Sequence, residues 1–125
     1  MIDHISIGVK DLEQAKVFYE QLLSVIGYQK LAERPTTIGF GKKYPEFWLN
    51  HRPNLVLQDQ DTGSHICFRT SSIEQVNIFH QTALKLGASC LGSPGYRKEY
   101  SNNYYAAFIK DGNNHKLEVV TFVQS

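Results

Sequence analysis

Three residues whose side chains commonly bind metal ions stand at related places in this chain: His4, His65 and Glu118. Each histidine lies in a stretch where apolar and polar residues alternate, so it falls on the polar face of a predicted strand. Glu118 alternates with apolar neighbours in the same way, and a carboxylate there is costly to bury unless it is paired or metal-bound. Two imidazoles and one carboxylate predict a divalent-metal site with open coordination positions, which favours catalysis over a structural role.

The two histidines belong to an internal repeat. The segment from His4 to Gly27 matches the segment from His65 to Gly87 at an offset of 65 − 4 = 61, with a slip of one residue before the glycines. If the two copies pack symmetrically, a pseudo-twofold axis relates equivalent residues, so the two imidazoles can converge on one point. The repeat counterpart of Glu118 is Trp48, whose indole cannot bind a metal ion.

Each copy reads as a strand, an amphipathic helix and three further strands, which predicts an α+β fold of two βαβββ modules. Each helix has a predicted N-cap with a glutamine three positions later, and a glycine ends it; these residues are Asp11, Gln14 and Gly27 in the first copy and Ser72, Gln75 and Gly87 in the second. The later strands are predicted near residues 28–32, 37–40, 46–50, 89–91, 104–109 and 116–122. We interpret the chain as one domain over residues 1–125, with module one at 1–50, a linker at 51–63 and module two at 64–125.

The composition is that of an ordinary globular chain. It has 125 residues, 42% of them hydrophobic, and a formal net charge of +1, which does not indicate a nucleic-acid or membrane partner. The N-terminus lacks the features of a signal peptide and no apolar run is long enough to span a membrane, so we expect a cytoplasmic protein. Cys67 and Cys90 are interpreted as small packing residues rather than a disulfide.

The pattern resembles the vicinal oxygen chelate superfamily, which includes glyoxalase I, fosfomycin-resistance proteins, extradiol dioxygenases and bleomycin-resistance proteins. The resemblance covers nearly the whole chain and is carried by residues 2–12, Phe18-Tyr19, 64–68 and 111–118. The segment from Pro94 to Phe108 is similar to that of small bacterial members. The resemblance implies curved mixed sheets around a cavity, metal ligands at the positions of the two repeated histidines and Glu118, and a homodimer.

The resemblance also separates the activities within the superfamily. Glyoxalase I would have a carboxylate at Trp48, so the three-ligand set is more similar to fosfomycin-resistance transferases or dioxygenases. Ser6 stands where fosfomycin-type proteins have a substrate-contacting threonine, but the sequence lacks their cluster of phosphonate-binding lysines and arginines.

We expect the loop at residues 92–103 to form a wall or lid of the site.

Seven residues are candidates for contacting a substrate: Ser6, Phe40, Trp48, Arg97, Tyr100, Tyr104 and Tyr105. Phe40 and Trp48 either line the cavity or fill the core, and only one of Tyr104 and Tyr105 can face the cavity because strand neighbours alternate. Three other histidines, at positions 51, 80 and 115, are expected to be solvated, and no catalytic residue beyond the metal ligands is assigned.

The sequence thus predicts a metal-dependent enzyme, a lyase, isomerase, transferase or dioxygenase, acting on a small oxygenated substrate chelated by a divalent ion. Fe(II) would favour oxygenase chemistry, whereas Mn(II), Ni(II), Zn(II) or Co(II) would favour the other classes. The alternative is a metal-free protein of the bleomycin-resistance type, which binds a small molecule or antibiotic in an aromatic groove.

Overall fold

The computed structural model describes residues 1–124, and the chain divides into two compact units between Leu57 and Gln58. This division falls inside the stretch 51–63 that the sequence predicted as a linker; the prediction that both modules form one domain stays a prediction. The first unit contains β1 (Ile5–Val9), α1 (Leu12–Ser24), β2 (Gln29–Glu33), β3 (Thr37–Gly41) and β4 (Phe47–His51). The second contains β5 (Ile66–Arg69), α2 (Ile73–Lys85), β6 (Ser89–Tyr96), β7 (Tyr104–Lys110) and β8 (Lys116–Phe122).

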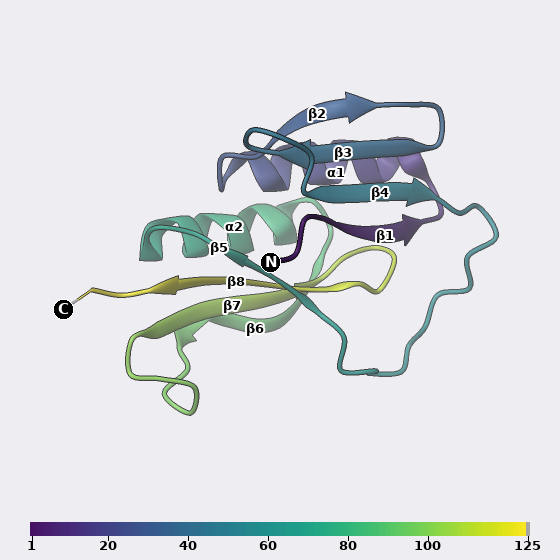
Figure 1. Cartoon of the computed structure of the whole chain (residues 1–125). Helices are drawn as coiled ribbons and strands as arrows, with labels where there is room; N and C mark the ends of the chain where they lie inside the picture. Colours follow the sequence, from purple (N-terminus) through teal and green to yellow (C-terminus); the bar gives the residue numbers. More distant parts are fainter. Residues whose placement is uncertain (125) are drawn as a thin grey trace. The chain divides into compact units, whose positions relative to one another are not determined.

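Each unit is one four-stranded mixed sheet with one helix (Figure 1). The strand order is β1-β4-β3-β2 in the first unit and β5-β8-β7-β6 in the second. The first and last strands of each unit pair in parallel, and the other pairs are antiparallel. The predicted α+β fold of two βαβββ modules is therefore confirmed. Each module has its own four-stranded sheet.

The helices begin and end where the capping chemistry predicted. The side chain of Asp11 accepts a hydrogen bond from the backbone N–H of Gln14, and that of Ser72 accepts the equivalent bond from Gln75. After the helices, Gly27 and Gly87 adopt φ values of +87° and +99°, a left-handed conformation that glycine adopts without steric cost. The same local sequence rules thus start and stop both helices.

One face of each sheet packs on its helix. In the first unit α1 contacts β2, β3 and β4, and in the second α2 contacts β6, β7 and β8. On the first helix Tyr19 is 1% exposed and packs in the core, whereas the neighbouring Phe18 is only partly buried. The fully or nearly fully buried apolar side chains include Val9, Leu22, Phe40, Phe47 and Leu49 in the first unit and Val76, Phe79, Ile109, Leu117 and Val119 in the second.

Two predicted strand bounds change. Strand β6 runs to Tyr96, so the first half of the expected loop at residues 92–103 is strand, with register shifts on either side of Gly92. Strand β4 includes His51, which the sequence placed in the linker.

Among residues 1–124, no helix combines the length and apolar character needed to cross a membrane.

Candidate metal and ligand site

The second unit brings together two of the three predicted metal ligands. His65 immediately precedes β5, and Glu118 lies within β8, directly opposite Cys67 in the parallel β5–β8 pair. The Nε2 atom of His65 lies 2.9 Å from Oε1 of Glu118. Glu118 is 3% exposed, whereas the His65 side chain is 43% exposed. A buried carboxylate thus meets an imidazole that remains open to solvent.

Tyr104 holds the other oxygen of this carboxylate. The Tyr104 hydroxyl, on β7, donates a hydrogen bond to Oε2 of Glu118. Burial raises the pKa of Tyr104, and the hydrogen bond to Glu118 raises it further, so the phenol stays protonated at neutral pH. The result is a fixed donor that orients the Glu118 carboxylate and leaves His65 on its other side.

Cys67 and Phe108 complete this face, and neither was among the residues predicted for the site. Both are register partners of Glu118, Cys67 from β5 and Phe108 from β7. Partial burial raises the pKa of the Cys67 thiol to about 12, and the charge of Glu118 contributes to this shift. The Phe108 ring lies 6.3 Å from the His65 ring, between centroids. Strand alternation already put Cys67 on the face of His65, which is the signal that could have identified it.

The His65–Glu118 pair fits a divalent ion in its donor types and spacing. Two ligand atoms about 2.1 Å from one ion and at a right angle lie about 3 Å apart, close to the 2.9 Å found here. Among residues 1–124, no three His, Cys, Asp or Glu side chains are grouped so that they could hold a metal ion. Catalytic metal sites usually have three protein ligands, so this pair supplies only part of such a set.

The first unit carries His4, Ser6 and Trp48. His4 precedes β1, is exposed, and its Nδ1 atom lies 2.8 Å from Oδ2 of Asp3. Ser6 and Trp48 are register partners in the parallel β1–β4 pair, so their side chains share one face of the sheet. The Arg34 guanidinium lies over the Trp48 ring, 5.2 Å from its centroid. The polar face predicted for β1 thus continues into an aromatic surface on β4.

Phe40 lies on the opposite face of that sheet. It is 0% exposed and is the register partner of Phe47, whose ring lies 5.1 Å from that of Tyr19 on α1. The sequence predicted that Phe40 either lines the cavity or fills the core, and this buried position fits core packing.

The two neighbouring tyrosines of β7 point to opposite faces, as alternation requires. Tyr104 reaches Glu118, whereas the Tyr105 hydroxyl donates a 2.8 Å hydrogen bond to Oδ1 of Asn77 on α2. Tyr104 is therefore the one that shares the face of the His65–Glu118 pair.

Arg97 and Tyr100 flank the same face. The Arg97 guanidinium lies 5.5 Å from the centroid of the Phe108 ring. It donates hydrogen bonds to the carbonyls of Gly95 and Ser93, at 2.9 and 2.8 Å, and so holds the irregular end of β6. The Tyr100 ring packs edge-on against Tyr104 at 5.1 Å between centroids.

Two sequence interpretations are wrong in the second unit. His80 was expected to be solvated, but it is 8% exposed, and its Nε2 atom lies 3.1 Å from the sulfur of Cys90. The repeat contained the signal, because the offset pairs His80 with the buried Tyr19 (19 + 61 = 80). The two cysteines form no disulfide, as expected, but both are exposed rather than packing residues.

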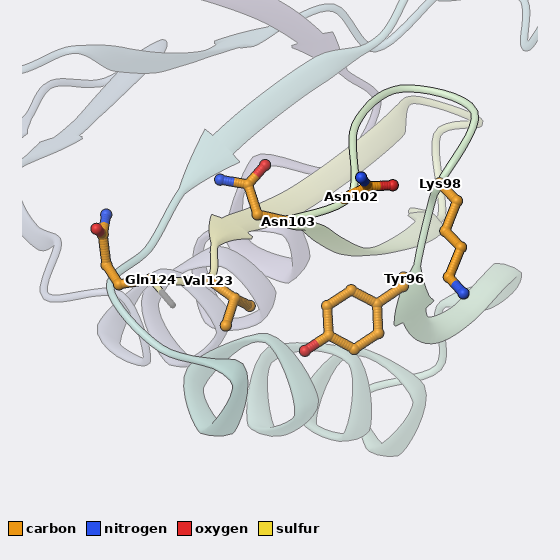
Figure 2. A pocket seen from close by; sticks show the side chains of 6 residues that line it. All are labelled: Tyr96, Lys98, Asn102, Asn103, Val123 and Gln124. Atoms are coloured by element: carbon orange, nitrogen blue, oxygen red, sulfur yellow. The ribbon is translucent and has the colours of Figure 1, made fainter.

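A surface pocket lies elsewhere on the second unit (Figure 2), where it is lined by Tyr96, Lys98, Asn102, Asn103, Val123 and Gln124. The Tyr96 ring packs edge-on against Tyr105, on the helix side of the sheet, so the pocket is separate from the His65–Glu118 face. Three of its residues come from the loop after β6, so this loop does form a wall, although of a different pocket from the one predicted.

Comparison with solved structures finds the same fold in several proteins. A glyoxalase/bleomycin resistance protein from Albidiferax ferrireducens is 26% identical, with a TM-score of 0.83, and the match covers 95% of this chain and 97% of that chain. A putative glyoxalase from Bacillus halodurans is 23% identical, with a TM-score of 0.72 and coverage of 97% and 95%. A variant of the fosfomycin resistance protein from Listeria monocytogenes, solved with Mn(II) and a dihydroxypropylphosphonic acid, is 18% identical, with a TM-score of 0.70 and coverage of 95% and 87%.

The comparison with curated proteins finds no match. A family model, described as the Glyoxalase/Bleomycin resistance protein/Dioxygenase superfamily, matches residues 1–119, which is nearly the whole chain. The repeat, the paired βαβββ units and this match agree, and the chain belongs to the glyoxalase/bleomycin resistance protein/dioxygenase superfamily.

Proposed function

We propose that this protein is a metal-dependent enzyme that acts on a small oxygenated substrate, with His4, His65 and Glu118 as the protein ligands of a divalent ion. The observation that carries the proposal is the buried carboxylate of Glu118, 3% exposed, beside the solvent-open imidazole of His65. Because this pair needs another protein ligand, His4, its repeat-related histidine, is proposed to supply it. A divalent ion in such a site supplies Lewis-acid stabilisation of negative charge on substrate oxygens.

The neighbouring side chains have defined roles in this proposal. Tyr104 fixes the orientation of Glu118, and its protonated hydroxyl prevents rotation of the carboxylate away from His65. The Phe108 ring gives the site an apolar side next to the imidazole, and the Arg97 guanidinium lies over that ring. Tyr100 is proposed to contact the substrate, because it is 62% exposed next to Tyr104.

Ser6 and Trp48 are proposed to contact the substrate from the first unit. They share one face of their sheet, and the serine hydroxyl can donate or accept a hydrogen bond there. The Mn(II) in the Listeria monocytogenes structure supports a divalent ion as cofactor, and Fe, Mn, Ni, Zn and Co are the candidates. We also propose that the protein is a homodimer, in which one chain or two can supply the three ligands.

Metal titration tests the proposal directly. Protein purified without chelators is melted with increasing Mn(II), Ni(II), Co(II) or Zn(II), and with Fe(II) under anaerobic conditions. A ligand that binds only the folded state raises its stability by about 2.7 kcal/mol at a free concentration one hundred times its Kd. We expect this rise in the wild type and in the His51→Ala control, and its loss in His4→Ala, His65→Ala and Glu118→Gln. Full metal binding by the His65→Ala and Glu118→Gln variants would overturn the ligand assignment.

A second function has one specific observation in its favour. Both oxygens of Glu118 already have partners within the chain, and Tyr104 stacks edge-on with Tyr100 and Phe122 at 5.1 and 5.3 Å between ring centroids. Such an aromatic surface suits a metal-free protein that binds a small molecule or antibiotic. This function would be favoured if the melting temperature of the wild type does not change with any of the ions but rises with a planar aromatic compound.

A further inference from the structure

A second pair of reactive side chains lies in the second unit, outside the candidate metal site. His80, on α2, is 8% exposed, and its Nε2 atom lies 3.1 Å from the sulfur of Cys90, an exposed residue on the edge strand β6. Cys90 is the register partner of Ile109, which in turn faces the buried Leu117. The pair therefore lies on the helix side of the sheet, whereas Glu118 points to the other side.

The arrangement combines an accessible nucleophile with an oriented base. The thiolate is the reactive form of cysteine, and an adjacent imidazole promotes its formation by accepting the thiol proton. Burial lowers the pKa of His80, so its imidazole is neutral at physiological pH and Nε2 can accept that proton. The Ser93 hydroxyl lies 3.9 Å from the same sulfur, so the surroundings of Cys90 are polar.

We propose that Cys90 is a modification site at which the thiol, with His80 as its base, exchanges with low-molecular-weight disulfides. The Cys90 sulfur attacks one sulfur of the small disulfide, the S–S bond of that disulfide breaks, and a mixed disulfide forms on Cys90. His80 takes the thiol proton and returns it to the departing thiolate. The small disulfide is the oxidant, and one half of it leaves as the reduced thiol.

The chain contains its own comparison thiol. Cys67 is also a free and exposed residue, and it lies opposite Glu118 in the parallel β5–β8 pair. Cys90 instead has the Nε2 atom of His80 at 3.1 Å from its sulfur. Variants that keep one cysteine each compare these environments within a single fold.

The test measures the release of a coloured thiolate from an aromatic disulfide by Cys67→Ser, Cys90→Ser and the double variant Cys67→Ser/His80→Asn. At pH about 7, the Cys67→Ser protein, which keeps Cys90, should react at least about tenfold faster than the Cys90→Ser protein. Replacement of His80 should slow Cys90 by at least about tenfold, since a positioned base contributes roughly a hundredfold or more. At pH about 10, above the usual thiol pKa of about 8.5, hydroxide ionises the thiol and the His80 effect should shrink to about twofold.

A His80 effect on the rate that shrinks at high pH distinguishes proton transfer by His80 from an effect on the accessibility of Cys90. Equal rates for the two single-cysteine proteins at neutral pH would overturn the proposal, as would a His80→Asn defect that persists undiminished at high pH. If circular dichroism shows that the His80 variant is unfolded, the comparison of the two single-cysteine proteins decides the matter. Incubation with oxidised glutathione, followed by mass spectrometry of peptides, should place the mixed disulfide on Cys90; its exclusive appearance on Cys67 would contradict the assignment.

Discussion

His65 and Glu118 are 53 positions apart in the chain, yet Nε2 of one lies 2.9 Å from Oε1 of the other. The parallel pairing of β5 with β8 brings them together, because it places Cys67, two residues after His65, opposite Glu118. The contact therefore requires the whole second unit, from its first strand to its last.

Removal of the Tyr104 hydroxyl should weaken this site. Tyr104→Phe deletes the donor to Oε2 of Glu118 and should lower the free energy of unfolding by about 1 kcal/mol or more, since the acceptor is a buried carboxylate. If the proposed ion binds, its affinity should fall about 10–100-fold, as for other groups that orient a ligand. Chemical denaturation and metal titration measure the two effects.

Tyr105→Phe is the matched control for this variant. Its hydroxyl donates to Asn77 on the other face of the sheet, in an exposed position. It should change stability by less than about 0.5 kcal/mol and leave metal affinity unchanged. Equal effects of the two substitutions would show that Tyr104 has no special role in orienting Glu118.

The equivalent caps of the two helices should contribute similar stability. Asp11→Ala and Ser72→Ala each remove a side-chain acceptor for a backbone N–H and should each cost about 1 kcal/mol in urea denaturation. Ser24→Ala is the comparison, because Ser24 donates to the Gln21 carbonyl inside α1 and alanine favours a helix. A cap variant no less stable than Ser24→Ala would argue against this account of the helix start.

Gly41 should tolerate no side chain. A Cβ atom there would overlap the backbone carbonyl oxygen of Tyr44, which cannot move without distorting the turn between β3 and β4. Gly41→Ala should therefore destabilise the protein by about 2 kcal/mol or more, whereas Gly112→Ala, with no atom within 4 Å of the new Cβ, should have a much smaller effect. Thermal melting of the two variants side by side provides the measurement.

His80 should make stability depend on pH in the acid range. Burial lowers the pKa of His80 below its ordinary value of 6.5, so the unfolded chain binds a proton more readily than the folded chain. Its contribution is therefore favourable to folding above pH 6.5 and is lost as the pH falls from there through the folded-state pKa. His80→Gln, which does not titrate, should show a shallower loss of stability between pH about 7 and 5. Identical slopes of stability against pH for the variant and the wild type would exclude His80 as the source of the pH dependence.

The internal repeat made most of the fold predictable. One offset relates the two copies, so the strand, helix and cap signals of each support those of the other, and both helices begin at the predicted caps Asp11 and Ser72. The centre of the α1 face was harder to predict, because Phe18 and Tyr19 are adjacent and both fit a helical stripe. Packing against Phe47 selects Tyr19.

The site was predictable in its residue types and less so in its contacts. Alternation shows that Tyr104 and Tyr105 face opposite ways, but which one meets Glu118 depends on the register of the β7–β8 hairpin. Its turn spans residues 111–115, and a shift of one residue there would exchange the two tyrosines. His80 was missed because a histidine in an amphipathic helix has no intrinsic preference for burial, and its contact with Cys90 depends on tertiary packing.

The position of β5 at the edge of its sheet has a consequence for how firmly the site is held. This four-residue strand has hydrogen-bonded neighbours on one side only, and its partner β8 is also held by β7. Local opening at the margin of a sheet costs less than unfolding of the centre, so β5 can detach while the β6–β7–β8 meander and α2 persist. Such fraying would separate His65 from Glu118, and a ligand that bridges the two would fasten an edge strand of the module to a central one.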